Sequence, residues 1–175
     1  QAAVSTVEAL EGQIKDARDT DEMRGVEGTA ARTYVGVFDG MILHQKEGFN
    51  FAGRTKRPPL DAVNAMLSFV YALLANDAEA ALEGVGLDPA VGFLHKDRSG
   101  RSSLALDLRE EFRTWLADRI VLSMINMKQV KPEDFRTTES GAVTMDDGAR
   151  KKILAEWHKR KQDEITHPYT GEKMP

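Results

Sequence analysis

The chain of 175 residues contains no cysteine. This absence excludes a disulfide framework and any metal site built from thiolates, and it fits a reducing compartment. The sequence also has no unbroken apolar stretch of the roughly 18 residues that a bilayer-spanning helix needs, and no signal peptide is visible at its start. We therefore expect a cytoplasmic protein with no membrane partner.

An excess of positive charge is also missing, because the formal net charge is −4. This value argues against a nucleic-acid-binding protein whose whole surface is basic. Basic side chains nevertheless gather in residues 54–57, 96–101 and 150–161. Local basic segments on an acidic protein fit contact with phosphate backbones, provided that the acids hold metal. The alternative for each segment is ordinary solubility, which we favour for the third.

The four histidines lack the close spacing of the HExxH motif that marks many zinc hydrolases. They are His44, His95, His158 and His167. Internal repeats and low-complexity tracts are missing too. The length suggests one domain, residues 1–175, with a core that needs no disulfide.

Apolar residues at three- and four-residue spacing predict a mainly α fold. The expected helices cover residues 1–18, 29–44, 61–76, 78–83, 103–127 and, after a cap at Asp146 or Asp147, residues up to about 165. A turn at 139–141 predicts a small β-hairpin near residues 135–145. The helix over 61–76 is the most apolar and should be central. Its polar stripe of Asn64, Ser68 and Tyr71 requires partners. The helix over 29–44 should be buried, and Trp115 should lie on the apolar face of the helix over 103–127.

The segment from Gly92 to Arg113 combines a histidine, a basic glycine loop and three carboxylates. On the expected helix, Asp107, Glu110 and Glu111 share one face, so their charges repel unless a cation lies among them. A divalent metal ion with His95 as a further ligand is one solution. The alternative is a solvated face on which Arg109 and Arg113 pair with the acids.

Glycines flank Glu27 on both sides, at Gly25 and Gly28. They suit the close approach of another backbone or of a ligand. In the alternative interpretation, Gly25 starts a helix and Glu27 lies in its first turn, where a negative charge is favoured. The sequence leaves both open.

The segment that follows, residues 46–60, has the composition of a loop. Its phenylalanines, Phe49 and Phe51, precede Arg54, Lys56 and Arg57. This mixture suits stacking and charge contacts with single-stranded nucleic acid, whereas the alternative is a polar loop anchored by two phenylalanines.

Glu27, His95 and one or two of the carboxylates on the 103–127 helix are the hard ligands that suit Mg²⁺ or Mn²⁺. A metal ion held by few protein groups among cations is suited to phosphodiester chemistry, because it polarises a phosphoryl oxygen and activates water or a 3′-hydroxyl. The residues thus favour a metal-dependent nuclease or strand-transfer enzyme.

Four blocks of the sequence, in order, resemble the C-terminal helical catalytic domain of Cas1, the CRISPR-associated endonuclease/integrase family of spacer acquisition. They are MRGVEGTAAR, FNFAGRTKRPPLDAVNAMLSFVYALL, GFLHKDRSGRSSLALDLREEFR and KRKQDEITHPYTGEKMP. The tail and the basic proline segment are most similar to a type I-C variety.

This resemblance implies a metal site made of Glu27, His95 and Glu110. Asp107 matches a second acid of the same block, as a ligand, a neighbour of a ligand or a DNA contact, and the family's third ligand is often aspartate, so the choice between Asp107 and Glu110 stays open. The resemblance also places a set of residues near the DNA path: Arg54, Arg57, Asn64, Tyr71, Lys96, Arg98 and Arg101.

By the same resemblance, the whole protein serves CRISPR antiviral defence. It would join the 3′ ends of spacer DNA to the CRISPR repeat by metal-assisted transesterification, as homodimers bridged by the small partner Cas2, and similar proteins cut branched DNA. The chain begins at Gln1 inside an expected helix, so we expect a fragment that lacks the family's N-terminal β-rich domain, without which integration and dimerisation are in doubt. The alternative of a different class is a non-catalytic helical interaction module that scaffolds a nucleoprotein complex.

Overall fold

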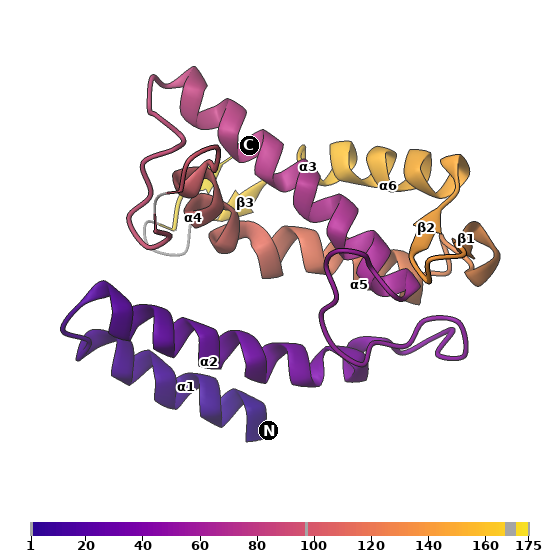
Figure 1. The fold of residues 1–175 in the computed structure, drawn as a ribbon, viewed down its shortest axis with the longest axis horizontal. Helices are drawn as coiled ribbons and strands as arrows, with labels where there is room; N and C mark the ends of the chain where they lie inside the picture. Colours follow the sequence, from indigo (N-terminus) through magenta and orange to yellow (C-terminus); the bar gives the residue numbers. More distant parts are fainter. Residues whose placement is uncertain (1, 97, 167–170, 175) are drawn as a thin grey trace.

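The computed structural model describes residues 2–96, 98–166 and 171–174 (Figure 1). The helices are α1 (Ala2–Lys15), α2 (Thr20–Phe38), η1 (Asp39–Met41), α3 (Ala62–Gly84), α4 (Ser103–Phe112), the π-helical η2 (Arg113–Asp118), α5 (Arg119–Asn126), η3 (Pro132–Asp134) and α6 (Asp147–Arg160). The strands are β1 (Phe135–Thr137), β2 (Val143–Met145), β3 (Ile165–Thr166) and β4 (Lys173–Met174). The predicted mainly α fold with a hairpin near residues 135–145 is confirmed.

An aspartate caps the N-terminus of each of the α-helices α2, α3 and α6. The side chain of Asp19 accepts hydrogen bonds from the backbone N–H groups of Asp21 and Glu22 at the start of α2. Asp61 and Asp146 do the same for α3 and α6, respectively. Such caps satisfy N–H groups that have no partner inside a helix, so the sequence fixes where these helices begin.

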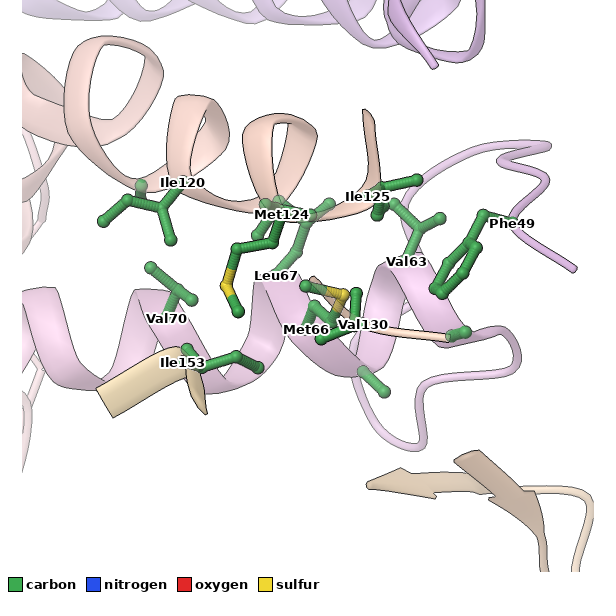
Figure 2. Packing of buried hydrophobic residues seen from close by; sticks show 14 of the residues in the cluster. Phe49, Val63, Met66, Leu67, Val70, Ile120, Met124, Ile125, Val130 and Ile153 are labelled. Carbon is green, nitrogen blue, oxygen red and sulfur yellow. The ribbon is translucent and has the colours of Figure 1, made fainter. Parts of the chain in front are cut away.

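The hydrophobic core lies around α3, as predicted for the most apolar helix. Figure 2 shows residues of α3 facing residues of α5, with Ile153 of α6 and Val130 closing the cluster. Phe49 and Phe51 of the loop between η1 and α3 also enter this core, with 0% and 6% of their surfaces exposed. The prediction that these two rings form a nucleic-acid stacking surface is therefore wrong, and they anchor the loop instead.

Two short antiparallel pairs of strands complete the fold. In the first, Phe135 lies opposite Met145 and Thr137 opposite Val143, in agreement with the predicted hairpin. In the second, Ile165 lies opposite Met174 in a segment that the sequence indicated only as a tail. His167 lies outside the described residues.

The N-terminal hairpin, formed by α1 and α2, lies to one side of the remaining helices (Figure 1). Helix α2 packs mainly on α1, and over most of its length it does not enter the core. Val37 is 42% exposed, so the prediction of a buried helix over 29–44 holds only for its end, at Phe38 and Ile42.

Gly25 lies inside α2, not at its start, which corrects that interpretation. A Cβ atom at Gly25 would meet nothing within 4 Å, so no other backbone approaches it.

The stretch from Ser103 to Asn126 is helical as predicted, but its middle turn is π-helical. A π-helical turn contains an additional residue, which shifts the register of the residues that follow. Trp115 is consequently 40% exposed, although the regular spacing predicts it on the apolar face, whereas Asp118 is fully buried. Two other bounds also differ from the prediction, because α3 continues through residues 78–83 and α6 ends at Arg160.

Helix α3 is the one candidate for a membrane span among the described residues, by length and composition only. Core helices of proteins without a membrane segment pass the same test. Here Val63, Met66 and Leu67 of this helix are buried in the core.

Candidate metal centre and nucleic-acid cleft

A cleft of about 960 Å³ separates α2 from α3, α4 and the loop before α3. Most of the charged residues predicted as functional face it from these two sides. Its charged and hydroxyl-bearing lining includes Glu27, Arg32, Tyr34, Arg54, Lys56, Arg57, Ser68, Tyr71, His95, Arg101, Arg109, Glu110 and Arg113. The fold thus brings the G-x-E-G block and the His95 block to one site, although some seventy positions separate them in sequence.

Asp107 of α4 holds the backbone and the ring of His95. Its Oδ1 accepts hydrogen bonds from the His95 backbone N–H at 2.9 Å and from the His95 ring Nδ1 at 2.7 Å. Its Oδ2 accepts from the backbone N–H groups of Phe93 and Leu94, at 2.8 and 3.1 Å. Burial by itself would raise the pKa of Asp107, but the hydrogen bonds from His95, Leu94 and Phe93 hold it below its ordinary value.

An ionised Asp107 keeps the proton of His95 on Nδ1, so Nε2 carries the lone pair. This is the arrangement in which a carboxylate orients a metal-binding histidine. Because both oxygens of Asp107 already accept two hydrogen bonds, the geometry supports a role in positioning His95 better than a role as a ligand.

Gly92 permits this close packing. A Cβ atom at position 92 would lie 2.7 Å from Cβ of Ser103 and 3.0 Å from Oδ2 of Asp107. Any side chain there would push the loop away from α4, so the GF-L-H segment requires glycine for a steric reason.

Glu110, one helical turn after Asp107, forms ion pairs on α4 and η2. Its Oε1 accepts a hydrogen bond from Arg109 at 2.6 Å, and its Oε2 accepts one from Arg113. The solvated-face interpretation expected pairs at i+3 or i+4, and the Arg113 pair has this spacing, whereas Arg109 is adjacent to Glu110. Glu110 is only 18% exposed, so they are more than a loose surface contact.

The predicted metal ligands share the cleft but do not already form a complete site. Glu27 lines it from α2, whereas His95 and Glu110 line it from the opposite side. In residues 2–96, 98–166 and 171–174, no three His, Asp or Glu side chains lie close enough together to hold a metal ion. The ligand set Glu27, His95 and Glu110, with or without Asp107, therefore stays a prediction.

The start of α2 is joined to the loop that carries His95 by the α2–loop contact, formed by Asp21, Arg24, Leu94 and Lys96. Arg24 donates to the backbone oxygen of Leu94 at 2.6 Å, and Asp21 pairs with Arg24 and, at 3.3 Å, with Lys96. The hydrogen bonds from Arg24 and Lys96 lower the pKa of Asp21. This contact places Glu27, one turn further along α2, opposite His95.

The predicted polar stripe on α3 finds its partners in the basic loop. Arg54 donates to Oδ1 of Asn64 at 2.7 Å and to Oγ of Ser68 at 3.0 Å, and its guanidinium lies 5.3 Å from the centre of the Tyr71 ring. Asn64 is fully buried and also donates to Gly53 and Asp61. Asn64 therefore does not line the cleft itself but holds Arg54, which does.

The other predicted DNA residues differ in their placement. Arg57 and Arg101 line the cleft, whereas Lys96 and Arg98 lie exposed on the loop that follows His95. Gly100 has a φ of +72°, which allows this loop to turn sharply before α4. Asp97, in the same loop, lies outside the described residues.

Desolvation by the cleft, followed by the charges of Arg54 and Arg109, lowers the pKa of Lys56. The side of the cleft opposite α2 is thus crowded with cations. It has the charge that a polyanion requires.

Sequence reasoning missed Tyr34, Arg109, Arg113 and Asp118 as residues of the site or its support. Arg109 and Arg113 carried a signal, since they stand beside the acids, but it pointed to solubility. Asp118 carried a signal as well, because a charged residue between Leu116–Ala117 and Ile120–Val121 interrupts an apolar run. The register shift in η2 concealed its direction.

The sequence matches the family described as "CRISPR associated protein Cas1" over residues 1–159. It is 54% identical over 162 residues to "CRISPR-associated endonuclease Cas1 1" of Chlorobaculum tepidum, which covers 93% of this chain and 47% of that protein. It is 44% identical over 171 residues to "CRISPR-associated endonuclease Cas1" of Leptospira interrogans, covering 98% and 67%. The chain thus spans about half the length of several of the curated relatives it matches.

Solved structures with the same fold belong to related proteins. A casposase bound to its integration product superposes with a TM-score of 0.80 at 31% identity, over 93% of this chain and 47% of that one. A Cas1 protein from Thermotoga maritima gives 0.81 at 26% identity, over 89% and 49%. A partial Cas6-RT-Cas1–Cas2 complex gives 0.84 at 28% identity, over 93% and 49%.

Proposed function

Because the chain belongs to the Cas1 family of CRISPR-associated proteins, we propose that it is the catalytic part of a metal-dependent DNA endonuclease/integrase. Its reaction would join the 3′ ends of spacer DNA to the CRISPR repeat by transesterification, with cleavage of branched DNA as a related activity. The observation that carries the proposal is one cleft in which an oriented histidine and two carboxylates face a group of arginines.

The residues present fit a divalent cation of the Mg²⁺ or Mn²⁺ type. Glu27, His95 and Glu110 would hold it, because two carboxylates and an imidazole nitrogen are suitable hard donors. When bound, the ion would neutralise charge on a phosphoryl oxygen and lower the pKa of the attacking hydroxyl. Glu110 would first have to exchange its pairs with Arg109 and Arg113 for the cation.

The remaining chemistry rests on the protein's own groups. Asp107 would hold the proton on Nδ1 of His95 and so leave the lone pair on Nε2 of this cleft-lining residue. Arg54, Arg57 and Arg101 line the same cleft, where their charges would hold the phosphate backbone on either side of the reacting bond. Release of Arg109 and Arg113 from Glu110 would add two more cations for the phosphates.

The proposed partners follow from the relatives. One solved relative is a casposase bound to an integration product, and others are complexes that contain Cas2. We propose double-stranded spacer DNA and the CRISPR repeat as substrates, Cas2 as a protein partner, and homodimers in the whole protein. Since the CRISPR repeat is cellular DNA, the proposal places the protein in the cytoplasm. The type I-C assignment stays a prediction.

One observation favours a second candidate function, the non-catalytic interaction module. Glu110 pairs with two arginines, as a purely structural carboxylate would. In that case, the cleft would bind DNA without any dependence on a divalent ion at these residues.

The deciding experiment measures Mn²⁺ at this site and the reaction together. We expect crystals soaked in Mn²⁺ to show an anomalous peak between Glu27, His95 and Glu110. We also expect Glu27→Ala and His95→Ala to abolish cleavage and strand joining by the natural protein, at least about 10³-fold, while both variants still unfold cooperatively. The thermal midpoint should stay near that of the wild type for Glu27→Ala and fall for His95→Ala, which removes a hydrogen bond from the buried Asp107. Glu111→Gln is the matched control, because Glu111 is exposed on the same helix. The absence of a peak between these three residues would support the interaction module. Retained activity in both alanine variants would overturn the assignment of Glu27 and His95 to the reaction.

A further inference from the structure

Asp118 is a buried carboxylate that the proposed chemistry does not use. It ends the π-helical η2 and has 0% of its surface exposed. Its Oδ1 accepts a hydrogen bond from the Tyr71 hydroxyl at 2.5 Å, whereas its Oδ2 has no hydrogen-bond partner in the part of the chain that the structure describes. Burial raises the pKa of Asp118, against the opposing effects of the hydroxyl groups of Tyr71 and Tyr34. A buried carboxylate with an unpaired oxygen lowers the stability of the fold, so we expect Asp118 to have a functional role.

The partner of Asp118 supports two cations of the cleft. The guanidinium of Arg54 lies 5.3 Å from the centre of the Tyr71 ring, and that of Arg109 lies 5.9 Å from it. Both distances fall in the range of attractive cation–π contacts. A phenol that donates its proton to a carboxylate has a more electron-rich ring, which strengthens this attraction. Tyr71, Arg54 and Arg109 therefore form one cluster, in which Tyr71 connects both guanidiniums to Asp118.

The two arginines need such support because they are partly removed from water. The Nε atoms of Arg54 and Arg109 are buried and lack hydrogen-bond partners within the described residues. Burial lowers the pKa of Arg54, while the negative charge of Asp118 acts in the opposite direction. An ionised Asp118 would thus supply a negative charge close to these cationic side chains of the cleft.

We propose that Asp118 is a positioning residue for DNA phosphates. Through the Tyr71 hydroxyl it fixes the ring on which Arg54 and Arg109 lie, and the two guanidiniums are thereby aimed into the cleft. This inference rests on the proposed function, because the ligand is the phosphate backbone of the DNA substrate. Asp118 itself touches neither DNA nor the reacting groups.

Simple electrostatics and the positioning role predict opposite results for Asp118→Asn. Removing a negative charge near a DNA-binding cleft should by itself strengthen binding. If Asp118 positions the arginines, the same change should weaken binding, because Arg54 and Arg109 lose the fixed Tyr71 ring, even though Arg54 keeps its hydrogen bonds to Asn64 and Ser68. Asparagine keeps the shape and one acceptor, so the comparison tests the charge.

The experiment measures the affinity of the natural protein for a fluorescently labelled branched DNA duplex, by anisotropy, over a series of salt concentrations. Chelator is present so that no cleavage occurs. We expect Asp118→Asn to weaken binding about tenfold and to reduce the slope of log K against log salt by about one, as for the loss of one phosphate contact. Tyr71→Phe, which keeps the ring but removes the hydroxyl, should give a similar loss, and the double variant should lose little more.

Asp77→Asn is the matched control. Asp77 is a carboxylate outside the cleft that accepts hydrogen bonds from Trp157 at 3.1 Å and from Lys161 at 2.6 Å. Its loss should lower the thermal midpoint and leave the salt slope unchanged. An equal loss of slope in Asp77→Asn, or unchanged or tighter DNA binding by Asp118→Asn and Tyr71→Phe, would overturn the positioning role. If the wild type shows no salt-dependent DNA binding, the proposed function fails and this inference with it.

Discussion

The core region, residues 42–160, and the N-terminal hairpin contribute to the site in different ways. The core region buries a continuous cluster around α3 and α5, and it carries His95, Glu110 and the arginines (Figure 2). The hairpin buries little beyond Leu10 and Phe38, yet it carries Glu27. A predicted metal ligand thus lies on the less firmly packed side of the cleft. Metal binding would join the two regions. The stability of the N-terminal hairpin would then determine how easily Glu27 reaches the ion.

The largest expected difference between the regions concerns core packing. Met66→Ala in α3 should lower the free energy of unfolding by about 2 to 5 kcal/mol, because Met66 is fully buried and its removal leaves a cavity. Leu10→Ala in α1 should cost less than about 2 kcal/mol and mainly increase amide exchange within α1 and α2. Urea unfolding and hydrogen exchange measure these effects. Equal and global effects of both substitutions would remove the distinction between the regions.

An intermediate effect is expected at Asp107, which links α4 to the His95 loop. Its folded-state pKa lies below the ordinary value of 3.8, so the stability from its ionised form is present above about pH 4 and is lost as the pH falls through the folded-state pKa. Asp107→Asn should lower the free energy of unfolding at neutral pH by about 2 kcal/mol and make the acid limb of the stability curve shallower.

The check for Asp107 is thermal unfolding measured from neutral pH down to about pH 3, the range in which carboxylates titrate. Asp147→Asn, an exposed aspartate at the start of α6, is the control. If the wild type and Asp107→Asn lose stability in parallel as the pH falls, the carboxylate does not hold the loop in its ionised form.

The smallest expected effect is at the α2–loop contact, because its charges are largely exposed to water. Lys96→Ala should leave the thermal midpoint within error of the wild type. It should still increase amide exchange in the first turns of α2 and weaken Mn²⁺ binding severalfold, since Glu27 would be less well placed. Lys151→Ala, exposed on α6, should change neither quantity. Unchanged exchange in α2 would show that this contact does not join the two regions.

Much of the fold followed from the sequence because its signals are local. Asp61 and the apolar run after it define α3, and the turn at 139–141 defines the hairpin. The errors arose where tertiary contacts decide. Phe49 and Phe51 look available for stacking until the core takes them in, and the spacing around Val37 looks buried although one side of α2 faces the cleft.

The site was predictable only where a motif accompanied the spacing. His95 and Asp107 lie twelve positions apart, and no helical rule joins a loop residue to a helix residue at that distance. The residue types alone made His95, Asp107 and Glu27 candidates, and the resemblance to Cas1 assigned them to one site. The ion pair of Glu110 with Arg113 follows from helical spacing alone, whereas the pair with the adjacent Arg109 does not. Neither a motif nor helical spacing predicted Asp118 as a residue of the site, because a π-helical turn leaves no simple pattern in the sequence.

The π-helical η2 also has a consequence for insertions and deletions. In an α-helix each residue turns the chain by about 100°, so deleting one residue from positions 113–117 would restore a regular helix and rotate everything after it by that angle relative to α4. Ile120 and Met124 would then leave the core, and Asp118 would leave Tyr71. A single-codon deletion here would therefore be far more damaging than most substitutions, and proteins that share this cleft should keep the length of this turn even where its residues differ.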